Sequence, residues 1–490
     1  MNFKPHLIPV FLIFFFLFTN SFGNISEKES NKDIPYYKIP ELLLSQYIKY
    51  PSVTGVEKEA GEYFTEVSRN LDLYIRVFTD DLSSYNFAAS LYPLSLGKPN
   101  IILLNHVDVV PAGDLNSWKF PPFSGTIIDG EVWGRGAIDN KGQAVMQLHA
   151  IAHFVELSKQ IDLPFNVTML TVSNEETGGT LGAAIIVDEF LEELNPVVVY
   201  GEGGTGIIGL LKSDENYPFF GISVAQKRGL WFSLESNSNS SGHGSMPRHQ
   251  YPNREVVLAS KALIKSKPQI ILTDPVRDMI RELSGYEKGR RRFVLRNIRF
   301  FAPFFSKTLR EDELVSAMIS NTMTLTNLYS TPGADNQVSN QARAVFDCRL
   351  LPNTSTEKFL DYVKHKIKNY DVSLKVIHET PHAPISEQGH YYYALAEAIK
   401  NSHGDVGVAP LLFPANNDNA YFRIHGIPAY GLFPAVLSIE LMETIHMTDE
   451  RLPINLLHNG IEAYIELIKI LLDLDDEHYD SFIKKLTLKY

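Results

Sequence analysis

Three short apolar runs rich in β-branched residues recur in the first half of the chain, at Asn100–Leu104, Val167–Val172 and Pro196–Tyr200. Each run is bounded by polar residues or glycines. Segments with helical spacing lie between or after them, notably Gly142–Leu157 and, at the end, Pro453–Leu472. Strands that are apolar throughout are typical of a sheet covered on both faces. The alternation therefore predicts an α/β fold, with a mostly parallel sheet flanked by helices.

The pattern changes in the second half of the chain, where helix-like stretches mix with loops. Strand-like alternation of apolar and polar residues returns at Met323–Leu328 and Ala342–Leu350. We interpret residues 224–382 as a smaller α+β domain inserted into the sheet domain. The sheet domain then comprises residues 35–223 and 383–490.

The first 23 residues have the pattern of a targeting segment and not that of a folded domain. Lys4 precedes an apolar run, Leu7–Phe18, which is followed by the small-x-small pattern Ser21-Phe22-Gly23. Such a run is short for a membrane span and normal for a secretory signal. We therefore expect residues 1–23 to be a signal peptide and the mature protein to be secreted or periplasmic. The alternative is an uncleaved signal anchor that holds the protein on a membrane.

Composition narrows the function classes. A chain of 490 residues is too long for one hydrophobic core and predicts two or more domains. The formal net charge of −12 argues against nucleic acid as a general partner, because phosphates would be repelled. The single cysteine, Cys348, excludes an intrachain disulfide framework and argues against a cysteine-ligated metal site.

Acidic residues and a histidine follow the predicted strands. His106 and Asp108 are two positions apart at the end of the first run, so they lie on one face of the strand. A carboxylate beside an imidazole is typical of metal-binding or catalytic histidines. The adjacent Glu175 and Glu176 follow the second run, and Glu202 follows the third. Because ligand sites in such sheets lie at the carboxyl ends of the strands, we expect these side chains to meet.

Two further residues fit the same chemistry. Asp139 lies in the loop GRGAIDNKG before a helix, where it is either a ligand or a helix cap, and His446 precedes the last helix. Adjacent glutamates are both ionised only near a strong cation. Oxygen and nitrogen donors without sulfur suit two Zn²⁺ ions, with Co²⁺ or Mn²⁺ as substitutes. One of the two glutamates then binds metal, and the other is free to take a proton from water between the ions.

The motifs HVDVVP, GRGAIDNKG, NEETGG, GEGG and IHMTDERL, in this order, resemble the dinuclear zinc exopeptidases and deacylases. That family includes aminoacylase, carboxypeptidase G, acetylornithine deacetylase and yeast carboxypeptidase S. The resemblance covers roughly residues 40–475, and the stretch Pro414–Ala435 is most similar to the aminoacylase and carboxypeptidase S branch. Two stretches depart from the family pattern: Asn336 lacks the valine and proline that usually follow it, and the loop ANND lacks a common glycine–threonine pair.

The resemblance implies a fold with an inserted lid and dimerisation domain, and it assigns the metal ligands. One zinc ion is expected on His106, Asp139 and Glu202, and the other on Asp139, Glu176 and His446. Asp139 bridges the two ions. The family also has a cis peptide bond after this aspartate.

The resemblance implies catalytic roles as well. Glu175 is expected to be the general base. It takes a proton from the water between the two ions, which becomes the bridging hydroxide, and Asp108 is expected to orient His106. His243, in the loop GHGS, is expected to contact the substrate carbonyl oxygen, in dimeric members at the active site of the other subunit. A homodimer formed through the inserted domain is therefore expected.

Two residues of the inserted domain are expected to bind substrate. Arg349 matches the family arginine that binds the substrate carboxylate, and Asn327 matches a second polar contact. The implied activity is hydrolysis of an amide bond in small N-acyl amino acids or short peptides. A dipeptidase or carboxypeptidase with peptide preference is the alternative. A non-catalytic binding relative is disfavoured because every motif residue is present.

A basic and aromatic run, Arg290–Arg299, stands outside these motifs and continues into Phe300 and Phe301. We interpret it as a solvated lid helix packed by its aromatic residues. A patch for a membrane surface or an acidic partner is the alternative.

Overall fold

The computed structural model describes residues 34–239, 242–246 and 248–474. By its internal contacts the chain divides into two units, Met1–Pro35 and Tyr36–Tyr490, and the second is described below. The predicted signal peptide, residues 1–23, lies outside the described residues. None of the described helices is both long and apolar enough to cross a lipid bilayer.

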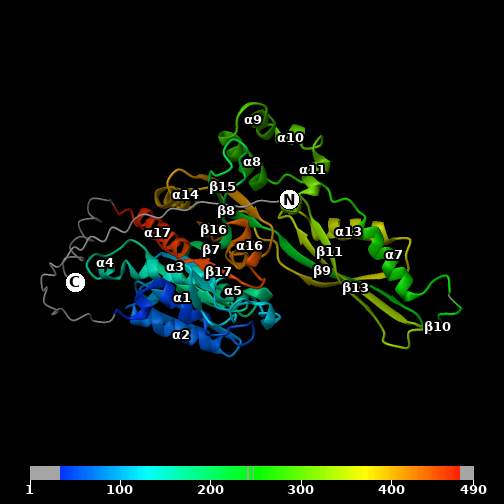
Figure 1. Ribbon diagram of the computed structural model, residues 1–490, viewed down its shortest axis with the longest axis horizontal. Helices are drawn as coiled ribbons and strands as arrows, with labels where there is room; N and C mark the ends of the chain where they lie inside the picture. Colours follow the sequence, from blue (N-terminus) through cyan, green and yellow to red (C-terminus); the bar gives the residue numbers. More distant parts are fainter. Residues whose placement is uncertain (1–33, 240–241, 247, 475–490) are drawn as a thin grey trace, which may run out of the picture. The chain divides into compact units, whose positions relative to one another are not determined.

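The larger sheet has eight strands in the order β1-β2-β6-β3-β7-β16-β8-β15 (Figure 1). β3 is parallel to both β6 and β7, β16 is parallel to β7, and β15 is parallel to β8. The edge formed by β1 and β2 is antiparallel, as is the pairing of β8 with β7 and β16. The fold class predicted from the sequence is confirmed. The strands are β1 (Tyr74–Asp81), β2 (Ser84–Ser90), β3 (Asn100–His106), β6 (Asn166–Val172), β7 (Pro196–Ile207), β8 (Phe219–Gln226), β15 (Gly407–Phe413) and β16 (Ala429–Val436).

Both faces of this sheet are covered, which explains why its central strands are apolar throughout. In β3, Ile101 and Leu103 belong to one hydrophobic core, whereas Ile102 and Leu104 belong to another. The helices of the first core are α1 (Pro40–Ile48), α2 (Lys58–Asn70), α3 (Lys141–Ala152), α14 (His390–His403) and α17 (Ile454–Leu471). Those of the second are α5 (Ala183–Glu189), α6 (Leu191–Leu194) and α15 (Asn419–Ile424).

The predicted helices are found with one difference. The final helix, predicted at Pro453–Leu472, is α17. The segment Gly142–Leu157 instead forms two helices, α3 and the short α4 (Val155–Ser158), with a turn at His153 and Phe154 between them. A small antiparallel sheet has three strands in the order β17 (Arg451–Pro453), β5 (Glu131–Trp133) and β4 (Thr126–Ile128).

A second, antiparallel sheet contains four strands in the order β11-β13-β9-β14. Alternate residues of β13, including Ala344, Phe346 and Cys348, are fully buried in a separate core beneath two helices. The predicted strands Met323–Leu328 and Ala342–Leu350 are thereby confirmed. The elements are β9 (Arg228–Asn237), β11 (Thr322–Ser330), β13 (Gln341–Leu350), β14 (Ser373–Glu379), α7 (Pro252–Ile264) and α13 (Thr356–Ile367), and a hairpin pairs β10 (Gly242–His243) with β12 (Gln337–Val338).

Five helices, α8 to α12, lie in sequence between the strands of the smaller sheet but pack elsewhere. Val276 of α8 and Met318 of α12 belong to the core of the larger sheet, and α8 contacts β15. The division into a sheet domain and an insertion at residues 224–382 stays a prediction. These helices are α8 (Asp274–Tyr286), α9 (Gly289–Arg296), α10 (Ile298–Phe301), α11 (Ser306–Glu311) and α12 (Glu313–Ile319).

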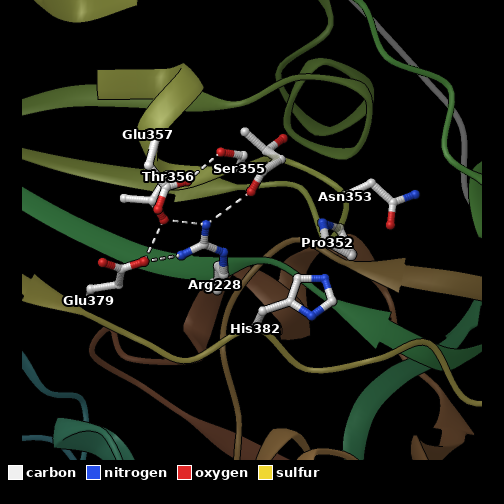
Figure 2. A pocket seen from close by; sticks show the side chains of 9 residues that line it. Arg228, Pro352, Asn353, Ser355, Thr356, Glu357, Glu379 and His382 are labelled. Carbon is white, nitrogen blue, oxygen red and sulfur yellow. Dashed lines mark hydrogen bonds and ion pairs between the residues drawn. The ribbon is translucent and has the colours of Figure 1, made fainter. Parts of the chain in front are cut away.

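Arg228 stabilises the connection between β8 of the larger sheet and β9 of the smaller sheet through an ion pair and hydrogen bonds. Its Nη1 lies 2.9 Å from Oε1 of Glu379, and its Nη2 donates hydrogen bonds to the Thr354 carbonyl at 3.0 Å and to Oγ1 of Thr356 at 2.6 Å. Figure 2 shows these groups lining a cavity of about 370 Å³. The guanidinium therefore joins the start of β9, the end of β14 and the start of α13.

Candidate metal centre

The predicted ligands gather where neighbouring strands of the larger sheet end. His106 is the last residue of β3, and Glu202 lies in β7. Glu175 and Glu176 open a short 3-10 helix, η4 (Glu175–Thr177), soon after β6 ends. Because β6, β3 and β7 are parallel neighbours, their carboxyl ends deliver these side chains to one edge of the sheet.

Two loops supply the remaining ligands. Asp139 lies in the loop before α3, and its peptide bond to Asn140 is cis, as predicted. His446 follows α16 (Ile439–Thr444) and has a φ of 62°. Non-glycine residues seldom adopt this left-handed conformation, and those that do are frequent at functional sites.

Asp139 contacts both histidines through different oxygens. Its Oδ1 is 3.1 Å from Nε2 of His106, and its Oδ2 is 3.1 Å from Nε2 of His446. Nε2 of His106 is also 3.3 Å from Glu202, and Nε2 of His446 is 3.1 Å from Glu176. The five predicted ligands thus form two groups of three that share Asp139.

The two adjacent glutamates have different neighbours. Ligand atoms of Glu175 lie within 4.8 Å of those of His106 and Glu202, so by distance alone Glu175 also qualifies as a ligand. However, Glu176 contacts a histidine directly, whereas the carboxylate of Glu175 makes no hydrogen bond or ion pair with any described residue. The geometry therefore leaves Glu175 with the less constrained carboxylate.

Burial and crowding perturb the pKa values of the acids. Burial raises the pKa of Glu175 well above its ordinary value, and the nearby charge of Glu202 adds to the effect. Burial also raises the pKa of Glu176 to about 7, although its contact with His446 opposes the change. For Asp139, burial acts in the same direction, but its two histidine contacts hold the pKa below the ordinary value.

The histidines respond to the same carboxylates. Contacts with Asp139 and Glu176 raise the pKa of His446 to about 10. Burial lowers the pKa of His106, but contacts with its carboxylate neighbours outweigh burial and raise this pKa well above the ordinary value. Four carboxylates and two imidazoles in one partly buried cluster supply the oxygen and nitrogen donor atoms that divalent cations such as zinc bind.

Asp108 connects the strand that ends in His106 to the turn that carries both glutamates. Its fully buried carboxylate accepts hydrogen bonds from the backbone N–H groups of Glu175 and Glu176, both at 3.1 Å, and from the Thr54 hydroxyl at 2.8 Å. Its Oδ1 is 3.5 Å from Nδ1 of His106, and its carbonyl oxygen is 2.9 Å from the same nitrogen. One carboxylate therefore contacts the imidazole that it is predicted to orient and also caps the turn.

No role was predicted from the sequence for Glu450. Its fully buried carboxylate is 2.6 Å from Nη1 of Arg135 and accepts backbone hydrogen bonds from Gly136 at 2.9 Å, Ile138 at 2.9 Å and Asp139 at 3.0 Å. It therefore holds the loop that presents Asp139. Its place in the motif IHMTDERL was the available signal, but Arg135 is 315 residues away, so no spacing pointed to the contact.

Three asparagines around Glu202 were also missed. Asn140 donates a hydrogen bond to Oε2 of Glu202 at 3.0 Å, whereas Asn417 and Asn419 donate to its carbonyl oxygen at 2.9 and 2.7 Å. In the sequence, the loop ANND stood out only as a departure from the family pattern. In the structure the amide of Asn417, from this loop, holds the backbone of a predicted metal ligand together with the amide of Asn419.

The predicted substrate-binding residues lie on the smaller sheet and its hairpin. Arg349, in β13, is one-third exposed and makes two 3.0 Å contacts with the two carboxylate oxygens of Asp347. His243, in β10, is exposed, and its Nε2 is 3.2 Å from Nδ2 of Asn336. Asn327 is exposed on β11. Figure 1 shows β10 at the end of the smaller sheet that lies away from the larger sheet, and among the described residues His243 bonds with Ser245 and Asn336 and with none of the predicted metal ligands.

Comparison with known proteins agrees with this geometry. Residues 102–470 match the sequence model of a family described as "Peptidase family M20/M25/M40". "Probable carboxypeptidase S-like 2" of Dictyostelium discoideum is 27% identical over 416 residues, 83% of this chain and 77% of the relative. "N-fatty-acyl-amino acid synthase/hydrolase PM20D1" of Xenopus tropicalis is 25% identical over 425 residues, 85% and 81% of the two chains. The M20 family metallo-carboxypeptidase Sso-CP2 from Sulfolobus solfataricus superposes with a TM-score of 0.67 at 19% identity, covering 89% of this chain and all of its own.

Proposed function

The chain belongs to peptidase family M20/M25/M40, and from this premise we propose that it hydrolyses N-acyl amino acids at a centre of two zinc ions. The family makes it a metal-dependent hydrolase of peptides or N-acyl amino acids. The observation that carries the finer proposal is Asp139 between two histidines, with 3.1 Å contacts on both oxygens. A preference for acyl groups is supported by the name of the Xenopus tropicalis relative.

The described side chains fit a pair of zinc ions. We assign His106, Asp139 and Glu202 to one ion and Asp139, Glu176 and His446 to the other. All donors are nitrogen or oxygen atoms, as suits zinc, with Co²⁺ or Mn²⁺ as substitutes. Oε1 of Glu176 is buried without a hydrogen-bond partner among the described residues, which is costly unless a cation contacts it.

Glu175 is the proposed proton carrier. Bound at the assigned residues, a zinc pair supplies Lewis acidity, which lowers the pKa of water and polarises a carbonyl group. The Glu175 carboxylate accepts a proton from the attacking water as the water oxygen bonds to the carbonyl carbon. It then returns this proton to the amide nitrogen as the C–N bond breaks, releasing a carboxylic acid and an amino acid. Burial, which raises the pKa of Glu175, helps it to hold the proton between the two steps.

Asp108 serves this chemistry as a positioning residue. Its contacts with His106 and with the backbone of both glutamates fix a ligand and the base relative to each other. Thr54 anchors the carboxylate from the other side. Small displacements of a base or ligand weaken proton transfer steeply, so this support is expected to matter for turnover.

Arg349 is the proposed receptor for the substrate carboxylate. Its planar guanidinium already makes a two-pronged contact with Asp347, so a substrate carboxylate would exchange with or share that partner. Asn327 is assigned a second polar contact. His243 is assigned to the substrate carbonyl oxygen, and because of its position on β10 this assignment requires a homodimer in which the hairpin reaches the other subunit.

The test is a hydrolysis panel with zinc- or cobalt-reconstituted protein. It contains N-acyl amino acids of increasing acyl length, the corresponding amides without a free carboxylate, and dipeptides. Arg349→Ala should lower kcat/KM for the acids roughly 10- to 100-fold more than for the amides, because a charge-assisted contact is lost. Arg349→Lys should restore part of the difference.

Arg343→Ala is the matched control, since Arg343 lies on the same strand and pairs with Glu235. It should leave the ratio of acid to amide unchanged. Equal losses for acids and amides in Arg349→Ala would remove the carboxylate role. A preference for dipeptides over every N-acyl amino acid would replace the proposed substrate class with a peptidase activity, the function in the name of the Dictyostelium discoideum relative.

A further inference from the structure

Helices α9 to α11 carry an unusual local charge. The chain as a whole has a formal net charge of −12, yet between Lys288 and Arg310 there is no acidic residue. The same stretch contains five phenylalanines, Phe293, Phe300, Phe301, Phe304 and Phe305. Its eight basic residues are Lys288, Arg290, Arg291, Arg292, Arg296, Arg299, Lys307 and Arg310.

Four of the five phenylalanines in this stretch are exposed, and Phe301 is half-buried. Phe293, Phe300 and Phe304 have exposed fractions of 61%, 67% and 75%, and Phe305 has 44%. Their rings lie together: the centroids of Phe300 and Phe304 are 5.9 Å apart, and Phe301 is 5.1 Å from Phe300 and 5.8 Å from Phe293. The interpretation of this run as a solvated helix packed by its aromatic residues holds for Phe301, which contacts Phe293 of α9, but Phe293, Phe300 and Phe304 remain largely exposed. The rings form an apolar patch on the surface, and such patches mark interaction sites.

Most of the arginines around this patch are not neutralised. The five arginines between Arg290 and Arg299 are exposed, and four of them have no side-chain hydrogen bond or ion pair with any residue that the structure describes: Arg290, Arg292, Arg296 and Arg299. Long basic side chains beside exposed aromatic rings are the composition of surfaces that lie on anionic membranes.

A cavity of about 550 Å³ opens beside the same helices. Arg277, Arg299 and Arg310 line it together with apolar residues, including Ile270 and Leu272. Guanidinium groups next to apolar walls suit a group that is anionic at one end and hydrocarbon at the other. The cavity and the patch therefore favour the same kind of ligand, one with an anionic group and a hydrocarbon part.

Helix α8 connects the patch to the larger sheet. α8 precedes it in the chain and contacts β15 of the larger sheet, and Val276 of α8 is buried in the core of that sheet. Figure 1 shows α9 and α10 beyond α8, on the side away from β15. A ligand held by α9 to α11 would therefore be held against the body that carries the candidate metal centre.

We propose that α9 to α11 form a docking surface for an anionic lipid membrane. The basic side chains contact lipid phosphates and carboxylates, and the exposed phenylalanines enter the interface. A second copy of this chain is a poor occupant, because a symmetric contact would place two basic patches against each other. The inference is independent of the proposed substrate and of the metal centre.

The test uses the full chain and sedimentation with vesicles. One set of vesicles contains phosphatidylcholine alone, and the other contains phosphatidylcholine with phosphatidylserine. Binding to the anionic set should be at least about tenfold tighter and should weaken as salt is added. The N-terminal segment with Lys4 and the apolar run Leu7–Phe18 is the same in every variant, so a difference between variants in binding does not come from it.

Two variants locate the surface. The triple variant Arg290→Gln, Arg292→Gln and Arg296→Gln should weaken binding to anionic vesicles roughly 100-fold. The double variant Phe300→Ser and Phe304→Ser should weaken it roughly tenfold. Because all these side chains are exposed, the unfolding temperatures should match that of the unaltered protein.

The matched controls change the same number of exposed basic or apolar side chains elsewhere on the surface. Lys261→Gln, Lys265→Gln and Lys267→Gln remove three exposed charges in and after α7, and Leu82→Ser with Leu115→Ser removes two exposed apolar side chains. Both should bind vesicles as the unaltered protein does. Equal binding to the two vesicle types, or unchanged binding by the arginine variant, would overturn the proposal. So would a dimer in the ultracentrifuge that dissociates in the Phe300→Ser and Phe304→Ser variant.

Discussion

At the scale of single residues, Glu175 and Glu176 are neighbours in sequence with different surroundings. Glu176 contacts His446 at 3.1 Å, whereas the carboxylate of Glu175 makes no hydrogen bond or ion pair with the described residues. We expect Glu175→Gln to keep both metal ions and to lower kcat about 10²- to 10⁴-fold, because only proton transfer is lost. We expect Glu176→Gln to lose metal instead. Elemental analysis and turnover of both variants make the comparison. Near-normal turnover in Glu175→Gln would show that another group is the base.

Glu450 leads to a second prediction at this scale. Its buried carboxylate pairs with Arg135 and accepts three backbone hydrogen bonds from the loop that ends in Asp139. Glu450→Gln should lower the free energy of unfolding by about 3 kcal/mol, because Arg135 is left buried without its counter-charge. It should also weaken metal binding by roughly tenfold, as loss of a residue that supports a ligand does. Denaturant unfolding and metal titration of the metal-free protein measure the two effects. Glu443→Gln, an exposed site nearby, is the control and should change neither.

At the scale of elements, helix α3 contains an acid-sensitive position. Burial lowers the pKa of His149 to about 4, and the charge of His458 adds to this effect. Its Nε2 is buried and has no hydrogen-bond partner among the described residues. The helix is therefore stable with His149 neutral.

The sign of the pH effect follows from linkage. In the unfolded chain His149 has an ordinary pKa near 6.5, so between pH 6.5 and about 4 the unfolded state binds a proton that the folded state does not. Stability is thus lost as pH falls through this range, by up to about 3 kcal/mol. His149→Gln should lose less stability between neutral pH and pH near 4 than the unaltered protein. Denaturant unfolding of both metal-free proteins tests this, and identical pH profiles would contradict it.

At the scale of the whole molecule, the candidate metal centre joins parts of the chain that are far apart in sequence. Its side chains come from β3, η4, β7, the loop before α3 and the loop after α16. Metal bound to the folded state alone should raise the free energy of unfolding by about 2.7 kcal/mol at a free concentration 100 times Kd. Chelation should therefore lower Tm, and added Zn²⁺ should restore it.

The control for this prediction is Asp139→Asn, which alters the residue shared by both groups of ligands. Its Tm should respond little to chelator or Zn²⁺. Elemental analysis of the unaltered protein should give close to two metal ions per chain. A content near zero, with no effect of Zn²⁺ on Tm, would refute a metal centre at this site.

The sequence by itself determined three central strands of the larger sheet, β3, β6 and β7, and the residues at their ends. Strands such as β3 and β6 are recognisable because both of their faces are buried, so apolar residues occupy successive positions and not only alternate ones. The groups at the strand ends, from His106 to Glu202, were then predictable because parallel strands end at one edge. These features depend on local pattern and on a general rule of sheet geometry, so no contact between distant residues had to be known.

Only the tertiary structure decided the contacts that hold the site and the exposure of the surface. Glu450 reaches Arg135 across 315 residues, and Asn417 reaches Glu202 across 215. Such pairs have no periodicity, because chain folding and not spacing brings them together. The phenylalanines of α10 show the same limit: an aromatic helical run packs inward or faces solvent according to what lies against it. Here α8 occupies the larger sheet's surface, and Phe300 is left 67% exposed.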